Sequence, residues 1–292
     1  MSATATLSPG LLERGVVSLR EEVMPGVWKL RLHSPRISAL GRPGQFVHIQ
    51  CAQAADPLLR RPFSFCDINP AAGTYDILFN VTGQGTAILA AAEAGQAFEA
   101  LGPLGRPFTI PDHGTLLAVA GGLGVAPFPL VARFAAERGV RFRWLNGAYT
   151  ANQLFPVEQL PGAVEARLAT EDGSAGLRGR VTELVRAELQ EATMIHACGP
   201  TPMLSALADI LFDHGGSAPP CEMSLEAPMG CALGTCLGCV VPSTDGGYAR
   251  VCVEGAVMDW RTVDWIRLAA MGELIHHRTP APRVGADVKV GD

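Results

Sequence analysis

Apolar and polar residues alternate along most of the first hundred positions. This period of two is typical of β-strands that bury one face. Gly, Pro, Asp and Asn separate the alternating stretches, as they do at the turns of antiparallel sheets. Short strands at this spacing predict a small antiparallel β-barrel, interrupted by one Ala- and Leu-rich helix at 86–94. The expected strands are 15–19, 27–32, 44–50, 62–66, 74–80 and 97–101.

The pattern changes after position 110. A continuous apolar run precedes a glycine-rich turn, and apolar strands then alternate with amphipathic stretches of helical length. Strands that alternate with helices of about 10–15 residues predict βαβ units and a parallel sheet. The expected strands are 115–120, 140–145, 164–170 and 193–197, and the expected helices are 127–138, 180–190 and 202–214.

A Gly- and Pro-rich segment at 215–220 reads as a linker to a third region. A short strand at 221–225, a group of cysteines and a hairpin signal at Asp245-Gly246-Gly247 follow it. We therefore expect a multi-domain chain with an antiparallel barrel, an α/β domain and a small cysteine-bearing domain. The expected limits are 1–110, 111–215 and 216–266, followed by a partly disordered tail at 267–292.

The composition excludes several classes of protein. The chain has 292 residues, of which 48% are hydrophobic and 17% charged, so it is not a disordered chain. Its formal net charge of −5 offers no basic excess for nucleic-acid phosphates. No apolar run reaches the length of a membrane span, and the first residues do not resemble a signal peptide. We expect a cytoplasmic protein without a membrane span or a nucleic-acid partner.

Four of the eight cysteines lie within 22 residues. Cys231, Cys236 and Cys239 follow the spacing C-x4-C-x2-C, and Cys252 follows after twelve intervening residues. This is the spacing of plant-type [2Fe–2S] proteins, in which two irons share four thiolates. The residues between the first three cysteines are mostly small, so backbone N–H groups have room to turn toward the sulfurs. The spacing predicts a [2Fe–2S] cluster with these four ligands.

A structural zinc site is the alternative. Zinc sites usually combine two closely spaced cysteine pairs, whereas Cys252 stands alone. Cys51, Cys66 and Cys221 lie in predicted strands, where a free thiol behaves as a small hydrophobic group.

Two segments of the barrel carry residues suited to bind a ligand that has both an anionic group and a flat ring. Arg61 can pair with a pyrophosphate, and the turn before Gly85 and Thr86 can offer backbone N–H groups to the same anion. Phe63 can stack on a ring system and Ser64 can hydrogen-bond its edge. The alternatives are that Phe63 belongs to the barrel core and that Arg61 is a solvated surface charge.

The segment Gly121-Gly122-Leu123-Gly124-Val125-Ala126-Pro127 follows an apolar strand and opens a helix, as phosphate-binding turns do. Cys198-Gly199-Pro200 follows another buried strand, at the sheet edge where ligands of α/β proteins bind. A thiol there can contact a nicotinamide ring, although a structural turn explains it equally well. Glu171-Asp172 lies either near an adenosine ribose or in a solvated loop.

Together these motifs resemble the ferredoxin-NADP reductase superfamily, which binds FAD on a barrel and a pyridine nucleotide on an α/β domain. The segments Ser224-Leu225-Glu226, Met229-Gly230-Cys231 and Val251-Cys252-Val253-Glu254-Gly255 resemble the electron-transfer subunits of class 1B dihydroorotate dehydrogenases. The resemblance extends from about residue 15 to residue 265.

The resemblance implies FAD, a [2Fe–2S] cluster and NAD(H) as cofactors, and it assigns roles residue by residue. Ser64 orients the flavin ring and Cys198 flanks the nicotinamide. The implied FAD site comprises Arg61, Pro62, Phe63, Ser64, Leu78, Phe79, Asn80, Gly85 and Thr86. The implied nicotinamide site comprises Gly121, Gly122, Gly124, Ala126, Pro127, Cys198, Gly199 and Pro200.

The resemblance also implies a partner. A separate FMN-containing catalytic subunit oxidises dihydroorotate for pyrimidine biosynthesis, and two copies of each subunit form a heterotetramer. Electrons then pass through the cluster and FAD to NAD⁺. Met229, Ala232, Leu233 and Leu237 are expected to form an apolar patch that faces this partner or shields the cluster from water.

Two other functions stay open at this point. The first is an NAD(P)H-dependent flavin and iron–sulfur reductase subunit for sulfite reductase, hydrogenase or ferredoxin. The small subunit of NADH-dependent ferredoxin:NADP oxidoreductases typically has Asp in place of Cys231, which disfavours that branch. The second is a non-redox zinc module or a regulatory nucleotide-binding protein.

Overall fold

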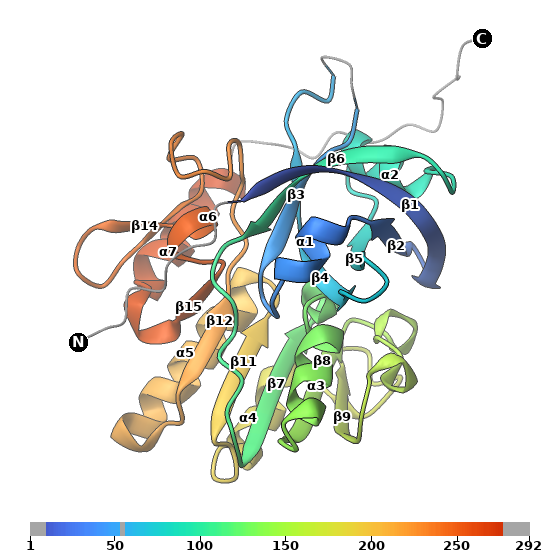
Figure 1. Cartoon of the computed structure of the whole chain (residues 1–292). Helices are drawn as coiled ribbons and strands as arrows, with labels where there is room; N and C mark the ends of the chain where they lie inside the picture. The colour runs from blue at the N-terminus through green and yellow to red at the C-terminus, as the bar shows by residue number, and fades with distance from the viewer. Residues whose placement is uncertain (1–9, 53–55, 277–292) are drawn as a thin grey trace.

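Six N-terminal strands close into an antiparallel barrel, in the order β1-β2-β5-β4-β3-β6. The computed structural model describes residues 10–52 and 56–276 of the chain, and the barrel forms its upper right part in Figure 1. The sequence predicted this antiparallel barrel, and the structure confirms it. The strands are β1 (Leu11–Met24), β2 (Val27–His33), β3 (Phe46–Gln50), β4 (Arg61–Asn69), β5 (Thr74–Asn80) and β6 (Ala97–Leu104).

Two features of the barrel differ from the prediction. β1 is much longer than the expected strand at 15–19, because it continues along both β2 and β6. The short helix α1 (Pro35–Leu40), which begins with a proline, was not predicted, since six residues are too few to show a helical period. The predicted Ala-rich helix is present as α2 (Gln84–Ala90).

The second part is a seven-stranded sheet in the order β10-β9-β8-β7-β11-β12-β15. All its neighbouring strands are parallel except β15, which runs antiparallel to β12. The central strand β7 is buried along its whole length, which explains its continuous apolar sequence. The strands are β7 (Thr115–Gly121), β8 (Arg141–Ala148), β9 (Val164–Thr170), β10 (Leu177–Arg178), β11 (Met194–Cys198), β12 (Cys221–Ser224) and β15 (Val257–Asp259).

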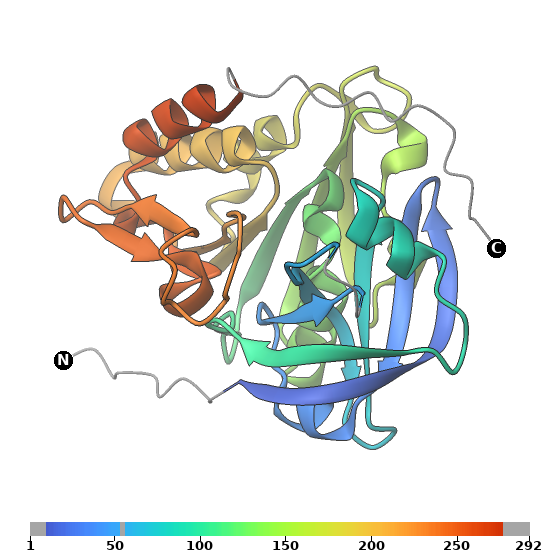
Figure 2. The same ribbon diagram turned by 90° about the horizontal axis from the view of Figure 1, so that it is seen from above.

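Helices cover both faces of this sheet (Figures 1 and 2). The 3-10 turn η1 (Gly122–Val125) and helix α3 (Phe128–Glu137) follow β7, and their apolar side chains pack in one core cluster. The helices α4 (Val181–Glu188) and α5 (Thr201–His214) pack in a second core cluster. The predicted α/β domain with a parallel sheet is therefore confirmed. Four short 3-10 turns complete the connections: η2 (Ala151–Gln153), η3 (Val157–Gln159), η4 (Gly215–Ser217) and η5 (Trp260–Thr262).

The cysteine-bearing region is tied closely to this sheet. β12 and β15 flank the cysteine segments in the sequence and extend the parallel sheet, so the segment 215–220 connects α5 to the next strand of one sheet. Between them lie the hairpin of β13 (Val240–Pro242) and β14 (Tyr248–Arg250) and the single turn α6 (Val251–Glu254). These elements are orange in Figure 1 and lie beside both the barrel and the sheet.

Helix α7 (Trp265–His276) occupies the first part of the segment that was expected to be a polar tail. Trp265 is buried and its Nε1 donates a hydrogen bond to the carbonyl oxygen of Trp260 at 2.9 Å, which fixes the start of the helix. The remaining residues, 277–292, and the disorder predicted for them lie outside the described residues. No helix within 10–52 and 56–276 has the length and apolarity needed to cross a membrane.

Candidate functional site

A cleft of about 410 Å³ lies between the barrel and the α/β sheet, and we call it the central cleft. Its walls come from β4, β5 and α2 of the barrel, from η1, and from the segments that follow β11 and β12. It brings together most residues singled out from the sequence: Arg61, Pro62, Phe63, Ser64, Leu78, Phe79, Asn80, Thr86, Gly121, Gly124, Ala126, Pro127, Cys198, Gly199 and Pro200.

Arg61 lines the central cleft, next to the start of α2. A Cβ atom on Gly85 would lie 3.5 Å from Nε of Arg61, an ordinary contact distance, so the Arg61 side chain runs beside the first turn of α2. The neighbouring Arg60 is engaged elsewhere, in an ion pair with Glu99. Of the two adjacent arginines, Arg61 is the one that lines the cleft.

Thr86 and Phe63 each have a structural role in addition to lining the cleft. The Thr86 hydroxyl accepts hydrogen bonds from the backbone N–H groups of Thr82 and Gly83, at 2.9 and 3.2 Å, and caps α2. Phe63 packs against Phe79 with ring centroids 5.5 Å apart and belongs to the barrel core. Phe63 is therefore both a residue of the barrel core, as the alternative interpretation stated, and part of the cleft wall.

The turn η1 packs tightly against the end of β11. A Cβ atom on Gly124 would lie 2.1 Å from the carbonyl oxygen of Cys198, so only glycine allows this approach. Burial raises the pKa of the Cys198 thiol to about 12, against a smaller opposing contribution from a hydrogen bond with Ser224. The thiol is therefore neutral near pH 7.

The cleft also contains residues that were not assigned to it from the sequence. They are Phe46 and Thr82 from the barrel, Leu123 from η1, and Ser224, Leu225, Glu226, Ala227, Met229 and Ala256 from the cysteine-bearing region. The last group forms a third part of the wall, beside those from the barrel and from η1. The cysteine-bearing region is thus part of the cleft wall, a relationship that only the pairing of β12 with β11 creates.

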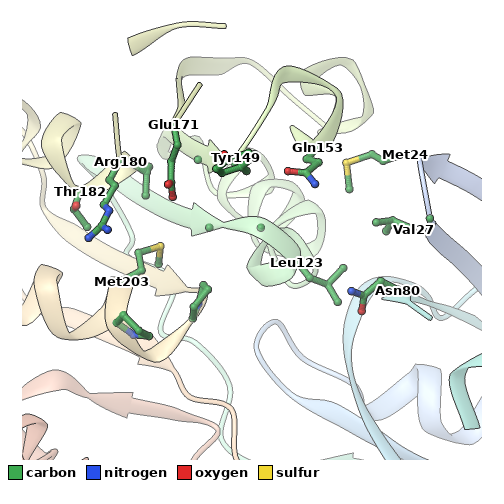
Figure 3. A pocket seen from close by; sticks show the side chains of 18 of the residues that line it. Met24, Val27, Asn80, Leu123, Tyr149, Gln153, Glu171, Arg180, Thr182 and Met203 are labelled. Atoms are coloured by element: carbon green, nitrogen blue, oxygen red, sulfur yellow. The ribbon is translucent and has the colours of Figure 1, made fainter. Parts of the chain in front are cut away.

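A second pocket of about 720 Å³, which we call the side pocket, adjoins the central cleft (Figure 3). Asn80, Gly121, Leu123 and Pro200 line both spaces. Gly122, with φ at +53°, lies in the wall of the side pocket, at the carboxyl end of β7 where open α/β sheets bind ligands.

The far end of the side pocket carries polar side chains from the ends of β8 and β9. Glu171 lines the pocket, while the adjacent Asp172 accepts hydrogen bonds from Ser174 in a turn. Arg180 and Tyr149 were not identified from the sequence and lie in the same wall. Figure 3 shows the Glu171 and Arg180 side chains on neighbouring parts of it.

The four clustered cysteines lie on two segments that meet beside the central cleft. Cys236 is exposed and Cys231 half-buried, whereas Cys239 and Cys252 are buried. The backbone N–H groups of Leu233 and of Gly238 donate to the sulfurs of Cys231 and Cys236, at 3.3 and 3.4 Å. Positive φ values of Ala232 and Leu237 turn the loop inward. The predicted N–H contacts to sulfur are confirmed for these two thiols.

The thiols interact in two pairs. A hydrogen bond from Thr235, followed by contacts that include Cys236, lowers the pKa of Cys231 to about 5. Burial, followed by hydrogen bonding to Cys239, raises the pKa of Cys252 to about 12. Two thiols for each of two irons is the donor set that a [2Fe–2S] cluster needs.

A single-metal site fits less well. Among the described residues, no three His, Cys, Asp or Glu side chains converge closely enough to hold one metal ion. A tetrahedral zinc site would need four donors around one point. The two-plus-two arrangement of thiols therefore favours the iron–sulfur interpretation.

The expected apolar patch on this loop divides into parts that face different ways. Leu233 and Leu237 are 57% and 59% exposed and flank the exposed Cys236. Ala232 is buried and Met229 lines the central cleft, so neither contributes to an outward surface. The interpretation of all four residues as one outward contact patch was wrong, because Ala232 is buried and Met229 lines the cleft.

Comparison with known proteins agrees with this geometry. Residues 226–264 match the family model described as the iron–sulfur cluster binding domain of dihydroorotate dehydrogenase B. The chain is 38% identical over 250 residues to the dihydroorotate dehydrogenase B (NAD(+)) electron transfer subunit of Geobacillus kaustophilus, covering 84% of this chain and 95% of that one. It is 36% identical over 249 residues to the Desulforamulus reducens protein of the same name, covering 82% and 94%.

Solved structures share the fold. The NADH-dependent reduced ferredoxin-NADP oxidoreductase superposes with a TM-score of 0.79 at 28% identity, over 90% of this chain and 94% of that one. A ferredoxin NADP⁺ reductase from Neisseria gonorrhoeae superposes with a TM-score of 0.57 at 18% identity, over 70% and 92%. Fold and site define an oxidoreductase of the ferredoxin-reductase type that uses FAD, a [2Fe–2S] cluster and NAD(H). Within that class, the chain belongs to the family of dihydroorotate dehydrogenase B electron transfer subunits.

Proposed function

We propose that this chain carries electrons from an FMN-containing dihydroorotate dehydrogenase catalytic subunit to NAD⁺, in the cytoplasm, within a heterotetramer of two copies of each subunit. When bound, the [2Fe–2S] cluster supplies single-electron transfer and FAD supplies conversion between single electrons and a hydride for NAD(H). The chain itself binds and aligns these groups and excludes water from the space between them.

In this proposal the central cleft holds FAD. Arg61 binds the pyrophosphate with its guanidinium, beside Gly85 in the first turn of α2. Ser64 lies in β4 opposite Phe46 and lines the cleft, where its hydroxyl is available to the edge of the flavin ring. Neutral Cys198 and the tightly packed Gly124 shape the opposite wall for the nicotinamide.

The side pocket holds the remainder of NAD(H). It opens from the central cleft along Gly121 and Leu123, so a nicotinamide in the cleft places the adenosine in the pocket. Glu171 at the far end accepts hydrogen bonds from ribose hydroxyls and repels a 2′-phosphate, which favours NADH over NADPH.

The loop with the cysteines provides a short route between the two redox groups. Met229 lines the central cleft and lies two residues before Cys231, and Ala256 lines the cleft four residues after Cys252. This shared wall is the single observation that carries the proposal. On the outer side, exposed Leu233 and Leu237 surround Cys236 and form the contact surface for the catalytic subunit.

An anaerobic spectral titration tests the proposal. The chain is purified from its host together with its bound partner, and dihydroorotate or NADH is added while visible absorption is recorded. Bleaching of flavin and cluster by both donors is expected. A Cys236→Ser variant is expected to respond to NADH through its flavin but to show no cluster bleaching with either donor.

Bleaching by NADH alone, in a preparation in which the partner subunit is present and binds dihydroorotate, would contradict the proposed donor. It would instead favour a reductase subunit for another acceptor, the role of the NADH-dependent oxidoreductase that shares this fold at a TM-score of 0.79.

A further inference from the structure

Arg250 lies where the segments that carry the four cysteines meet. It is the last residue of β14 and precedes Cys252 by two positions. Across the β13–β14 hairpin it pairs with Val240, the residue after Cys239. The backbone N–H of the next residue, Val251, donates to the carbonyl oxygen of Cys239 at 3.0 Å, which fixes this junction.

The Arg250 guanidinium reaches from this junction into the cysteine loop. Its Nη1 donates to the carbonyl oxygen of Gly234 at 3.3 Å, and Gly234 lies between Cys231 and Cys236. Gly234 has φ at +79°, and a Cβ atom on it would lie 2.7 Å from Cγ2 of Val253 and 3.2 Å from this nitrogen, so the loop packs against both segments only with glycine here. The side chain therefore contacts the middle of the loop that carries the first three cysteines.

Glu254 orients this cation. Nε of Arg250 donates to both carboxylate oxygens of Glu254 at 3.0 Å, and the backbone N–H of Arg250 donates to Oε2 at 2.7 Å. These hydrogen bonds hold the guanidinium between its carboxylate partner and the loop segment that joins Cys231 to Cys236.

We propose that the positive charge of Arg250 raises the reduction potential of the [2Fe–2S] cluster and that the negative charge of Glu254 lowers it. The balance of the two fixed charges then sets the potential. The inference rests on the cluster assignment made under Proposed function. Reduction adds one electron and therefore one negative charge to a site with four thiolate ligands, and a nearby cation stabilises the reduced form. Arg250 exchanges no electron or proton in this step.

An anaerobic redox titration of the full chain, followed by electron paramagnetic resonance of the reduced cluster, tests this inference. Arg250→Gln is expected to shift the oxidised-to-reduced ratio at a fixed potential about tenfold toward the oxidised form, which equals about 59 mV for one electron. Glu254→Gln is expected to shift the ratio toward the reduced form. The double variant is expected to lie between the two single variants.

Two further variants separate charge from packing. Arg250→Lys keeps the charge but lacks the planar fork, and it is expected to stay close to the wild-type potential. Arg261→Gln removes an exposed arginine that lies over the Trp260 ring, 5.2 Å from its centroid, and is expected to leave the potential unchanged.

Shifts of the same sign in Arg250→Gln and Glu254→Gln would overturn the inference, because loss of packing and not of charge would then explain both. Unchanged potentials in all variants, or a shift in Arg250→Lys as large as that in Arg250→Gln, would overturn it as well. A wild-type chain without the [2Fe–2S] signal would instead contradict the proposed function on which the inference rests.

Discussion

Gly124 and Cys198 approach each other so closely that a methyl group on the glycine would lie 2.1 Å from the cysteine carbonyl oxygen. This contact joins the turn after β7 to the end of β11, the neighbouring strand. It therefore fixes the wall of the central cleft where the nicotinamide is proposed to bind. Because the contacted atom belongs to the backbone, it has little freedom to move away.

Gly124→Ala is expected to displace η1 and slow flavin reduction by NADH about 100-fold, as small misalignments at reacting centres do. Overpacking is expected to lower the free energy of unfolding by about 1–3 kcal/mol. Stopped-flow absorption and urea unfolding measure the two effects. Gly216→Ala is the matched control, since no atom lies within 4 Å of its added Cβ. Normal reduction kinetics in Gly124→Ala would show that this contact does not shape the site.

Arg61→Ala is expected to weaken FAD binding about 10- to 100-fold, because a charge-assisted hydrogen bond to pyrophosphate contributes about 1.5–3 kcal/mol. Fluorescence titration of the flavin-free chain with FAD gives the dissociation constant. Arg60→Ala serves as the control, because Arg60 pairs with Glu99 and does not line the cleft. Equal losses in the two variants would mean that Arg61 has no specific role in holding the pyrophosphate.

Glu171→Gln is expected to reduce the preference for NADH over NADPH about tenfold, a change of about 1.4 kcal/mol. The substitution removes the negative charge that would repel a 2′-phosphate in the side pocket. The ratio of kcat/KM for the two coenzymes, with an artificial electron acceptor, measures the preference. Asp172→Asn is the control, since that carboxylate is bound to Ser174. An unchanged NADH-to-NADPH preference in Glu171→Gln would mean that the adenosine ribose does not bind next to Glu171.

Burial of His196 predicts a pH-dependent stability. The ring stacks on Phe108, with centroids 4.2 Å apart, and its Nε2 lies 3.0 Å from the Thr109 carbonyl oxygen. Burial lowers the pKa of His196 to about 3, even though the Glu222 carboxylate lies 3.5 Å from Nε2. Between pH 3 and 6.5 the unfolded chain binds a proton that the folded chain excludes, so stability falls as the pH drops below 6.5.

The size of this effect follows from the shift. Exclusion of the proton from His196 makes the free energy of unfolding about 2 kcal/mol lower at pH 5 than at pH 7, at 1.36 kcal/mol per pKa unit. His196→Gln is expected to lose this part of the pH dependence, as urea unfolding at pH 5, 6 and 7 would show. A wild-type and a variant chain with parallel pH profiles would rule out a neutral, buried His196.

Local patterns predicted much of the fold. The barrel strands alternate in polarity, the β7–η1 turn carries its glycines in one short stretch, and three of the cysteines lie within nine residues. Each of these signals depends on neighbours in the sequence. α7 was missed because its mostly apolar segment 268–275 was grouped with the polar residues from His276 onward, and because the start of the helix depends on the tertiary contact between Trp265 and Trp260.

The parts of the site that sequence analysis missed depend on contacts between distant segments. Tyr149 follows β8 and Arg180 follows β10, and both enter the side pocket because β8, β9 and β10 are parallel neighbours that end at one edge of the sheet. Met229 and Ala256 reach the central cleft because β12 pairs with β11 and β15 pairs with β12. Neither relationship leaves a periodic signal in the sequence.

The central claim is that the cleft and the cysteine loop form one electron path within this chain. Anaerobic addition of NADH to the purified chain, with absorption and electron paramagnetic resonance recorded on the same samples, tests it most directly. The account predicts flavin bleaching together with the signal of a reduced [2Fe–2S] cluster, and loss of that signal in Cys236→Ser. A bleached flavin beside a cluster that stays oxidised under excess NADH would contradict it.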